Sequence, residues 1–190
     1  KNLNVIFSTN GLLLTRTKIE ELIESGLDDI RIDFAANKEK YEEIRQQAVW
    51  EKAYHNILTF LEIKKQRGLL KPRILLVNID ISNTQEETEN NINKMRDLFR
   101  GHTVEILNLE LHTWAGEFAQ EAESDPVFKR LLSSKVKKGK YFPCPHIYSS
   151  FVITWNGDVV PCCRDLKKDY VIGNVKESSI MELWNSEKLI

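Results

Sequence analysis

All three cysteines of the chain lie in one stretch, CPHIYSSFVITWNGDVVPCC, which runs from Cys144 to Cys163. Between them stands Asn156-Gly157, flanked by strand-forming residues, and this pair is a strong signal for a tight hairpin because both residues tolerate positive φ. Antiparallel strands return to the same end, so we expect Cys144 and Cys162 to lie close enough to share a metal ion or a cluster. Thiolates suit both zinc and iron–sulfur clusters, and the residue pattern alone does not choose between them.

A structural interpretation of the same thiols is also open, in which Cys144 is a small buried residue and Cys162 and Cys163 end a hydrophobic strand by chance. Adjacent strand residues point to opposite faces, so Cys162 and Cys163 cannot both face one cluster unless the strand has ended before them. We expect Cys162 to be the ligand and Cys163 to be a neighbouring or spare thiol. His146 is a further ligand candidate, although a polar surface residue in a proline-flanked turn is the simpler interpretation of it.

Composition excludes several classes of protein. The chain has 190 residues, 42% of them hydrophobic, and its 27 basic residues nearly balance its 28 acidic ones. No global field therefore attracts nucleic acid or an acidic membrane. An odd number of closely spaced cysteines argues against a secreted disulfide framework. With no apolar run of transmembrane length and no signal peptide, we expect a cytoplasmic protein without nucleic-acid or membrane partners.

Element types alternate along the first 111 residues. Apolar or alternating segments predict strands at 3–7, 28–34, 73–81 and 104–111, and helical periodicity between them predicts three helices. The second of these is expected to run without a break from Lys38 to Gly68. The resulting β-α-β-α-β-α-β order predicts a parallel α/β sheet or part of a barrel with right-handed crossovers.

The pattern changes after His112, and a small separate module follows. It is expected to hold the hairpin and a short amphipathic helix over 178–189, with Trp155 and Trp184 in its core. The predicted organisation is a barrel portion over 1–115, a linker over 116–140 and a cysteine module over 141–190.

The module resembles the SPASM or twitch extension of radical SAM enzymes. Cys144, twelve residues, Gly157, four residues and Cys162 follow the opening of that signature, and VIGNV at 171–175 and SIMELWN at 179–185 are similar to its remainder. Upstream segments resemble the third and fourth β/α units of that family's partial barrel: STNG at 8–11, LIESGLDDIRI at 22–32 and KEKYEEIR at 38–45. The fold class implied is α/β, a portion of a parallel (β/α) partial TIM barrel followed by a small α+β SPASM/twitch-like module with a β-hairpin.

The resemblance implies a chemistry. The barrel would hold S-adenosylmethionine (SAM) against a [4Fe-4S] cluster, whose electron cleaves SAM to a 5′-deoxyadenosyl radical that abstracts a substrate hydrogen. Cys144 and Cys162 would be two ligands of an auxiliary [4Fe-4S] cluster. An oxidoreductase, an epimerase or a peptide-modifying enzyme fits this class. The substrate, a peptide or a small molecule, is unknown, and a flavodoxin or ferredoxin is the implied electron donor.

Two parts of the family pattern are missing. The CxxxCxxC motif of the catalytic cluster and the Gly-Gly-Glu-Pro-like segment do not occur, and further auxiliary-cluster cysteines would have to follow Ile190. We therefore expect a chain trimmed at both ends that does not generate the radical by itself.

Parallel barrels place their chemistry at the C-terminal ends of the strands. By the resemblance, the cofactor-binding positions are Ser8, Thr9, Asn10 and Asp33. Asp33 stands where the family commonly has serine, so it either pairs with the amino group of SAM or is a surface residue. His112 and Trp114 are candidates for the substrate pocket, although such residues in loops usually pack or cap.

Two other functions remain open from the sequence. One is a non-catalytic peptide- or protein-binding module stabilised by a metal or a cluster. The other is an α/β domain with spare thiols. A CxxxCxxC motif encoded upstream of Lys1 would favour the enzyme over both.

Overall fold

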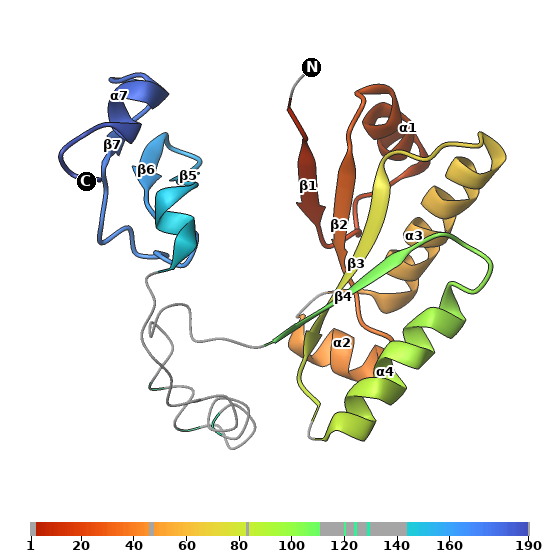
Figure 1. The fold of residues 1–190 in the computed structure, drawn as a ribbon. Helices are drawn as coiled ribbons and strands as arrows, with labels where there is room; N and C mark the ends of the chain where they lie inside the picture. The colour runs from red at the N-terminus through yellow and green to blue at the C-terminus, as the bar shows by residue number, and fades with distance from the viewer. Residues whose placement is uncertain are drawn as a thin grey trace. The chain divides into compact units, whose positions relative to one another are not determined.

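The computed structural model describes residues 3–45, 48–82, 84–110 and 144–189, together with the single residues 120, 124 and 129. The chain divides into two compact units, 1–111 and 112–190 (Figure 1). Within the described ranges, no helix is both long and apolar enough to cross a membrane. Each unit has its own sheet and its own core and is described by itself.

A four-stranded parallel sheet forms the centre of the first unit. Its strands are β1 (Ile6–Thr9), β2 (Asp29–Asp33), β3 (Arg73–Asp80) and β4 (Glu105–Glu110). They lie side by side in sequence order, all parallel, with helices in the connections (Figure 1). The predicted α/β fold class, a portion of a parallel barrel, is confirmed.

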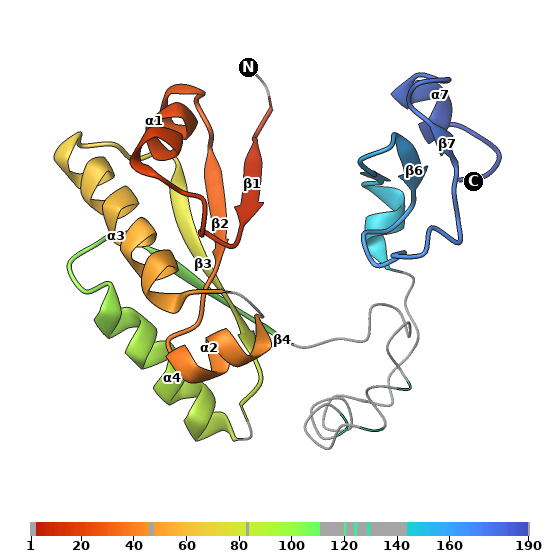
Figure 2. The same cartoon turned by 180° about the vertical axis from the view of Figure 1, so that it is seen from behind.

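Helices α1 (Arg16–Glu24), α3 (Trp50–Gln66) and α4 (Gln85–Leu98) lie on one side of this sheet (Figure 2). Two of them begin at threonine caps, because the side chains of Thr15 and Thr84 accept hydrogen bonds from backbone N–H groups of the first turn. Such a cap stabilises a helix by about 1 kcal/mol. The short α2 (Lys38–Ile44) precedes α3 in the connection between β2 and β3.

The core of the first unit lies between the sheet and these helices. Side chains of successive strand residues alternate between the two faces of a sheet. Ile32 and Leu76 are completely buried on the helical side, whereas Ile79 and Leu109, which are paired in register on the other face, are 40% and 49% exposed. Burial of each large core side chain stabilises the fold by roughly 1.5–3 kcal/mol. One face is thus covered and the other open, as expected of strands whose second face lines a barrel.

The prediction of a single helix from Lys38 to Gly68 is wrong. Two helices replace it, because Arg45 leaves the helical region (φ −101°, ψ 77°) and Val49 is extended (φ −110°, ψ 107°). The backbone N–H of Trp50 then donates to the Glu42 carboxylate at 2.9 Å, which gives the second helix a partner for its free N-terminal group. The first strand also lies later than predicted, so that Ser8 and Thr9 belong to β1 rather than to the following loop.

The second unit contains a short 3-10 helix, η1 (Pro145–Tyr148), and a three-stranded antiparallel sheet. Its strands are β5 (Val152–Ile153), β6 (Asp158–Val160) and β7 (Gly173–Asn174), and α7 (Ile180–Trp184) follows them. The predicted hairpin is confirmed: β5 and β6 pair antiparallel around Gly157, which has a φ of +94°. Val159 of β6, Ile172 just ahead of β7 and Leu183 of α7 are the buried residues of a small core within the described part of this unit.

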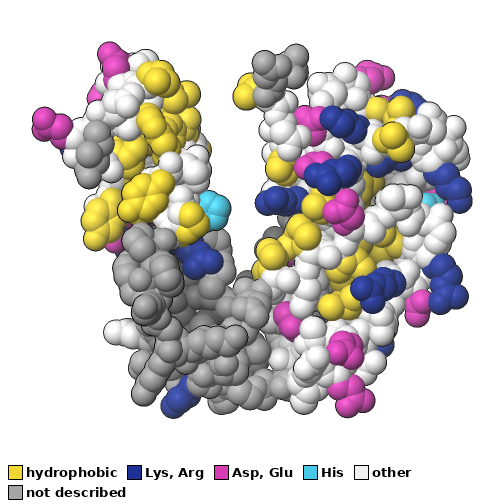
Figure 3. Space-filling model, in the orientation of Figure 1, with side chains coloured by type: hydrophobic (Ala, Val, Ile, Leu, Met, Phe, Trp, Pro, Cys, Tyr) yellow, Lys and Arg dark blue, Asp and Glu magenta, His cyan; other side chains and the backbone are white. Residues whose placement is uncertain are grey.

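Trp155 was predicted in this core, and that prediction is wrong. The residue occupies the hairpin turn itself and is 96% exposed. A tight turn directs its side chains outward, so an aromatic residue there cannot reach the core of so small a unit. Trp184 does pack inside the unit, against Phe151 with ring centroids 5.4 Å apart. Figure 3 shows other hydrophobic side chains at the surface of the second unit.

Candidate functional site

Cys144 and Cys162 flank the β5–β6 hairpin along the chain. Cys144 is exposed and lies directly ahead of η1, which precedes β5, and Cys162 is half-buried and follows β6 after Pro161. All three cysteines are free thiols. The backbone N–H of Arg164 donates to Cys162 Sγ at 3.4 Å. Backbone donors of this kind adjust the potential of an iron–sulfur cluster.

The argument from strand geometry for Cys162 over Cys163 holds only where the strand continues through both residues, and in the structure it does not. The strand ends at Val160, and the two cysteines lie in the turn that follows, where Asp165 N–H donates to the Cys162 carbonyl at 3.2 Å. The alternation of strand side chains therefore does not apply to them. Cys163 is exposed and is not excluded as a ligand by strand geometry. Among the residues that the structure describes, no group of three or more His, Cys, Asp or Glu side chains is arranged to hold a metal ion.

A network of polar side chains around Asp158 fixes the segment that follows the two cysteines. Lys168 donates to Asp158 at 2.9 Å, and Asn156 and Asn174 donate to it at 2.7 and 3.0 Å. These donors lower the pKa of Asp158 to about 2, and the hydrogen bond from Lys168 has the largest effect. Because Lys168 lies in the loop after the cysteines, the network ties that loop to the hairpin turn and to β7. It is the structural support of the candidate cluster site.

In the first unit, the predicted cofactor residues lie at the C-terminal edge of the sheet. Ser8 and Thr9 end β1, and Asp33 ends the neighbouring strand β2. The side chains of Thr9 and Asn10 accept hydrogen bonds from the backbone N–H groups of residues 11 and 12, at 3.2 and 3.1 Å. Thr9 and Asn10 therefore shape the turn, while the Ser8 side chain is exposed. The topology thus brings all four candidate residues to one edge.

Asp33 already has a partner. Arg45 donates to it through Nε at 2.5 Å and through Nη2 at 2.6 Å, and the guanidinium lies over the Tyr41 ring, 4.6 Å from its centroid. Two charge-assisted hydrogen bonds of this kind hold the Asp33 carboxylate and the Arg45 guanidinium in a fixed relative orientation. Arg45 is the last residue of the KEKYEEIR segment, and nothing in the local sequence pattern marks it as a functional residue.

A small pocket of about 30 Å³ adjoins the Asp33–Arg45 pair. It lies between α2, the end of β3 and α4, and its polar lining comprises Asn37, Lys40, Tyr41, Arg45, Asn78, Ser82 and Asn91. The Tyr41 hydroxyl is buried and has no hydrogen-bond partner within the described part of the chain. Burial raises the pKa of Tyr41, so this group is a neutral donor.

Further polar groups meet at the ends of β3 and β4. Asn78 donates to Asn108 at 2.7 Å, and Asn108 donates to Asp80 at 3.2 Å. Burial would raise the pKa of Asp80, but hydrogen bonds from Ser82, Thr88 and Asn108 outweigh it, so the pKa lies below its usual value. A signal for these residues was present, because two polar residues interrupt the otherwise apolar segment RILLVNIDI. The candidates His112 and Trp114 lie outside the described residues.

One family model matches the chain. It is that of SPASM, an iron-sulfur cluster-binding domain, and it covers residues 144–190, the segment that contains all three cysteines. No curated protein matches the chain.

Solved structures resemble the whole chain in fold. Streptococcus suis SuiB bound to its precursor peptide SuiA has a TM-score of 0.67 and 13% identity, over 98% of this chain and 48% of SuiB. SuiB bound to S-adenosylmethionine has a TM-score of 0.64 and 15% identity, with the same coverage. Histidine-tagged anSMEcpe with bound AdoMet has a TM-score of 0.60 and 16% identity, over 97% of this chain and 55% of that one.

Residues 144–190 match the SPASM domain that the resemblance predicted for this segment, and the chain shares the fold of SuiB and anSMEcpe. The chain spans about half the length of the solved structures that it matches.

Proposed function

We propose that this chain is part of a radical SAM enzyme in which the first unit contributes to the SAM site and the second unit to an auxiliary [4Fe-4S] cluster. One observation carries the proposal: an iron-sulfur cluster-binding domain matches the segment that holds every cysteine of the chain. The likeness in fold to proteins solved with bound SAM supports the role of the first unit.

Cys144 and Cys162 are the proposed ligands of the auxiliary cluster. Their chemistry fits an iron–sulfur group, because both are free thiols that flank one hairpin along the chain and Cys162 Sγ accepts a backbone N–H. A cubane cluster is usually held by four thiolates, so the proposal requires ligands in addition to these two. Cys163 is a candidate for one of them.

Ser8, Thr9, Asn10 and Asp33 are the proposed contacts to SAM. A bound SAM and its cluster would supply a radical that abstracts hydrogen from a substrate. The chain's own groups would bind and orient: the exposed Ser8 hydroxyl is available as a donor, and Arg45 holds the Asp33 carboxylate at the same edge. The CxxxCxxC motif of the catalytic cluster does not occur in this sequence, so the proposal places it elsewhere in the full protein. A flavodoxin or ferredoxin would supply the electron.

A peptide is the proposed substrate class, and the reaction an oxidative or epimerising peptide modification. The support is the likeness in fold to SuiB, which was solved with its precursor peptide. This part of the proposal is tested separately from the cluster, by incubating the reconstituted full protein with SAM, a reductant and candidate peptides and measuring a change in peptide mass.

Anaerobic reconstitution with iron and sulfide tests the cluster assignment. In the full protein that contains this chain, the Cys144→Ser and Cys162→Ser double variant is expected to lose about four iron atoms per protein, the content of one cubane, while the catalytic cluster remains. The matched control is Ser150→Ala, a hydroxyl in the same segment that donates to the His146 carbonyl and carries no thiol. It should keep the full iron content.

The readouts are iron and sulfide analysis and visible absorbance. Cys163→Ser is measured in parallel, and a loss of iron there would add Cys163 to the ligands. Stoichiometric zinc with no iron in the second unit, or unchanged iron in the double variant, would overturn the auxiliary cluster.

A further inference from the structure

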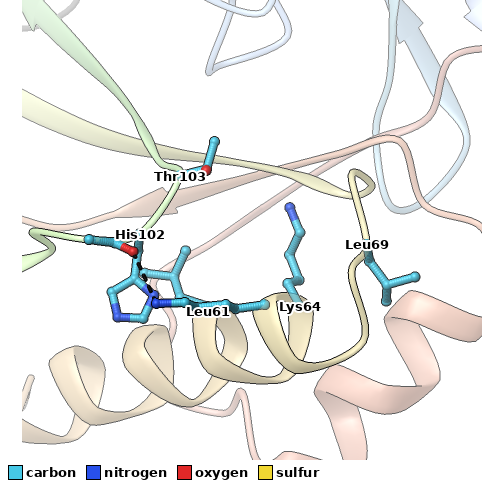
Figure 4. A pocket seen from close by; sticks show the side chains of 7 residues that line it. Leu61, Lys64, Leu69, His102 and Thr103 are labelled. Atoms are coloured by element: carbon cyan, nitrogen blue, oxygen red, sulfur yellow. Dashed lines mark hydrogen bonds between the residues drawn. The ribbon is translucent and has the colours of Figure 1, made fainter.

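A second pocket, of about 170 Å³, opens in the first unit at the end of the sheet opposite to the candidate SAM edge. It lies between the last turns of α3 and the loops that lead into β3 and β4, whereas Ser8 and Asp33 lie at the C-terminal ends of their strands. Its volume is many times the roughly 10–15 Å³ that one water needs. The residues that line it are Leu61, Lys64, Lys65, Leu69, Gly101, His102 and Thr103 (Figure 4).

Two lysines give the lining a positive charge and His102 adds a polar imidazole, and no Asp or Glu is among the described residues that line the pocket. In Figure 4, Lys64 extends from α3, and His102 and Thr103 come from the loop ahead of β4. The lysines of α3 and the imidazole of the loop before β4 therefore line one space.

Lys64 is a buried cation that is only partly satisfied. Its Nζ donates to the carbonyl of Leu70 at 3.2 Å and to that of Pro72. An ammonium group has three N–H donors, and the two carbonyls accept from only two of them. The third N–H of Lys64 can donate to a ligand. Burial lowers the pKa of Lys64, and this desolvation is what a nearby anion would offset. Lys65 reaches the Gly101 carbonyl only at 3.5 Å, the limit for a hydrogen bond, which leaves its ammonium free to turn.

His102 provides an independent observation. Its Nδ1 atom is buried and has no hydrogen-bond partner within the described part of the chain. Buried polar atoms in native proteins nearly always have a partner, and an orphaned one indicates a missing water, ion or ligand. The orphaned atom belongs to a residue that lines the pocket, beside the two lysines.

A purely structural role explains only part of this arrangement. Lysines in the last turn of α3 stabilise the helix dipole, and Lys64 also holds the loop before β3 through two carbonyls. Neither role uses His102 Nδ1. Neither explains why a space of this size is lined by two lysines and by no carboxylate of the described residues.

We propose that this pocket binds a phosphate group, held by Lys64, Lys65 and His102. Ammonium groups bind phosphate oxygens as point charges, and an imidazole nitrogen adds a directed hydrogen bond. The free ion and the phosphate of a small monoester share this chemistry. The site is separate from the edge proposed for SAM. The phosphate would therefore be an additional ligand of the protein and would take no part in the radical reaction.

Titration of the 190-residue chain with inorganic phosphate tests the site. Binding is followed by amide NMR shifts, with sodium chloride at equal ionic strength as the reference. A saturable response is expected that moves the amide signals of His102, Thr103 and Lys65. Lys65→Gln, an exposed position whose change leaves the core intact, should weaken binding about threefold to tenfold, the value of one ordinary hydrogen bond at a solvent-exposed site. The control is Lys52→Gln, an exposed lysine at the other end of α3, which should bind as the parent does.

Each outcome is decisive. His102→Leu is measured second, with far-UV circular dichroism to verify folding, and should weaken binding without affecting helix content. Tighter binding of glycerol phosphate than of phosphate would identify a phosphorylated small molecule as the ligand, and equal binding would identify the free ion. A response that does not saturate, or one that Lys65→Gln leaves unchanged, would overturn the proposal without bearing on the cluster.

Discussion

Arg45 and Asp33 form a bidentate ion pair, with Nε to Oδ2 at 2.5 Å and Nη2 to Oδ1 at 2.6 Å. The pair joins the residue after α2 to the last residue of β2. It therefore fixes the connection that carries the chain across the C-terminal edge of the sheet, next to the pocket that contains the orphaned Tyr41 hydroxyl.

Breaking this pair should destabilise the first unit modestly. Asp33→Asn and Arg45→Gln are each expected to lower the free energy of unfolding by about 1 kcal/mol, because the groups are partly exposed and water screens them. The double variant should lose little more than either single one, which is the sign of direct coupling. Urea unfolding measures all three, and strictly additive losses would contradict the pair. Lys18→Gln, which breaks an exposed pair on α1, is the control.

The pKa of Asp158 predicts an acid-sensitive second unit. A carboxyl whose pKa falls from 3.8 to about 2 on folding adds stability above the higher value, and that stability is lost as the pH falls through about 2. An NMR titration of the Asp158 carboxyl should therefore have its midpoint near 2. Lys168→Met removes the first of its donors and should move the midpoint upward toward 3.8. A midpoint near 3.8 in the parent chain would contradict the network.

Gly157→Ala should destabilise the hairpin that supports the cysteines. The residue has a φ of +94°, and an added Cβ would lie 2.8 Å from Asn174 Oδ1. Backbone strain and the clash together are expected to cost about 1–3 kcal/mol. Gly26→Ala is the matched control, because its φ is +73° but nothing lies within 4 Å of the added atom. Thermal unfolding of both variants separates strain from the clash, and an equal loss in the two would show that the contact with Asn174 does not matter.

The two tryptophans of the second unit should respond differently to truncation. Trp155→Ala removes a side chain that is 96% exposed and should change stability by less than about 0.5 kcal/mol. Trp184→Ala removes the ring packed on Phe151 and should cost about 2 kcal/mol or more. Chemical denaturation followed by far-UV circular dichroism measures both. An equal loss at the two positions would mean that Trp155 is covered in solution.

The sequence by itself determined the features that depend on short-range patterns. The alternation of apolar periods predicted four parallel strands with helices between them, and the Asn156-Gly157 turn predicted the β5–β6 hairpin. The spacing of Cys144, Gly157 and Cys162 carried the resemblance to SPASM, which the match over 144–190 bears out. Periodicity, turn propensity and spacing act over a few residues, so one sequence suffices to read them.

The tertiary structure decided what depends on contacts between distant residues. The helix predicted from Lys38 ends early, and Arg45, the residue that leaves it, pairs with Asp33 twelve positions away. The polar network of β3 and β4 joins Asn78 to Asn108 across thirty positions, and no local propensity records such a partner. The same holds for the proposed phosphate pocket, whose lysines come from α3 and whose histidine comes from the loop before β4. Charges and donors far apart in the chain become a site only when folding brings them together, because their interactions act over a few ångströms in space and not along the sequence.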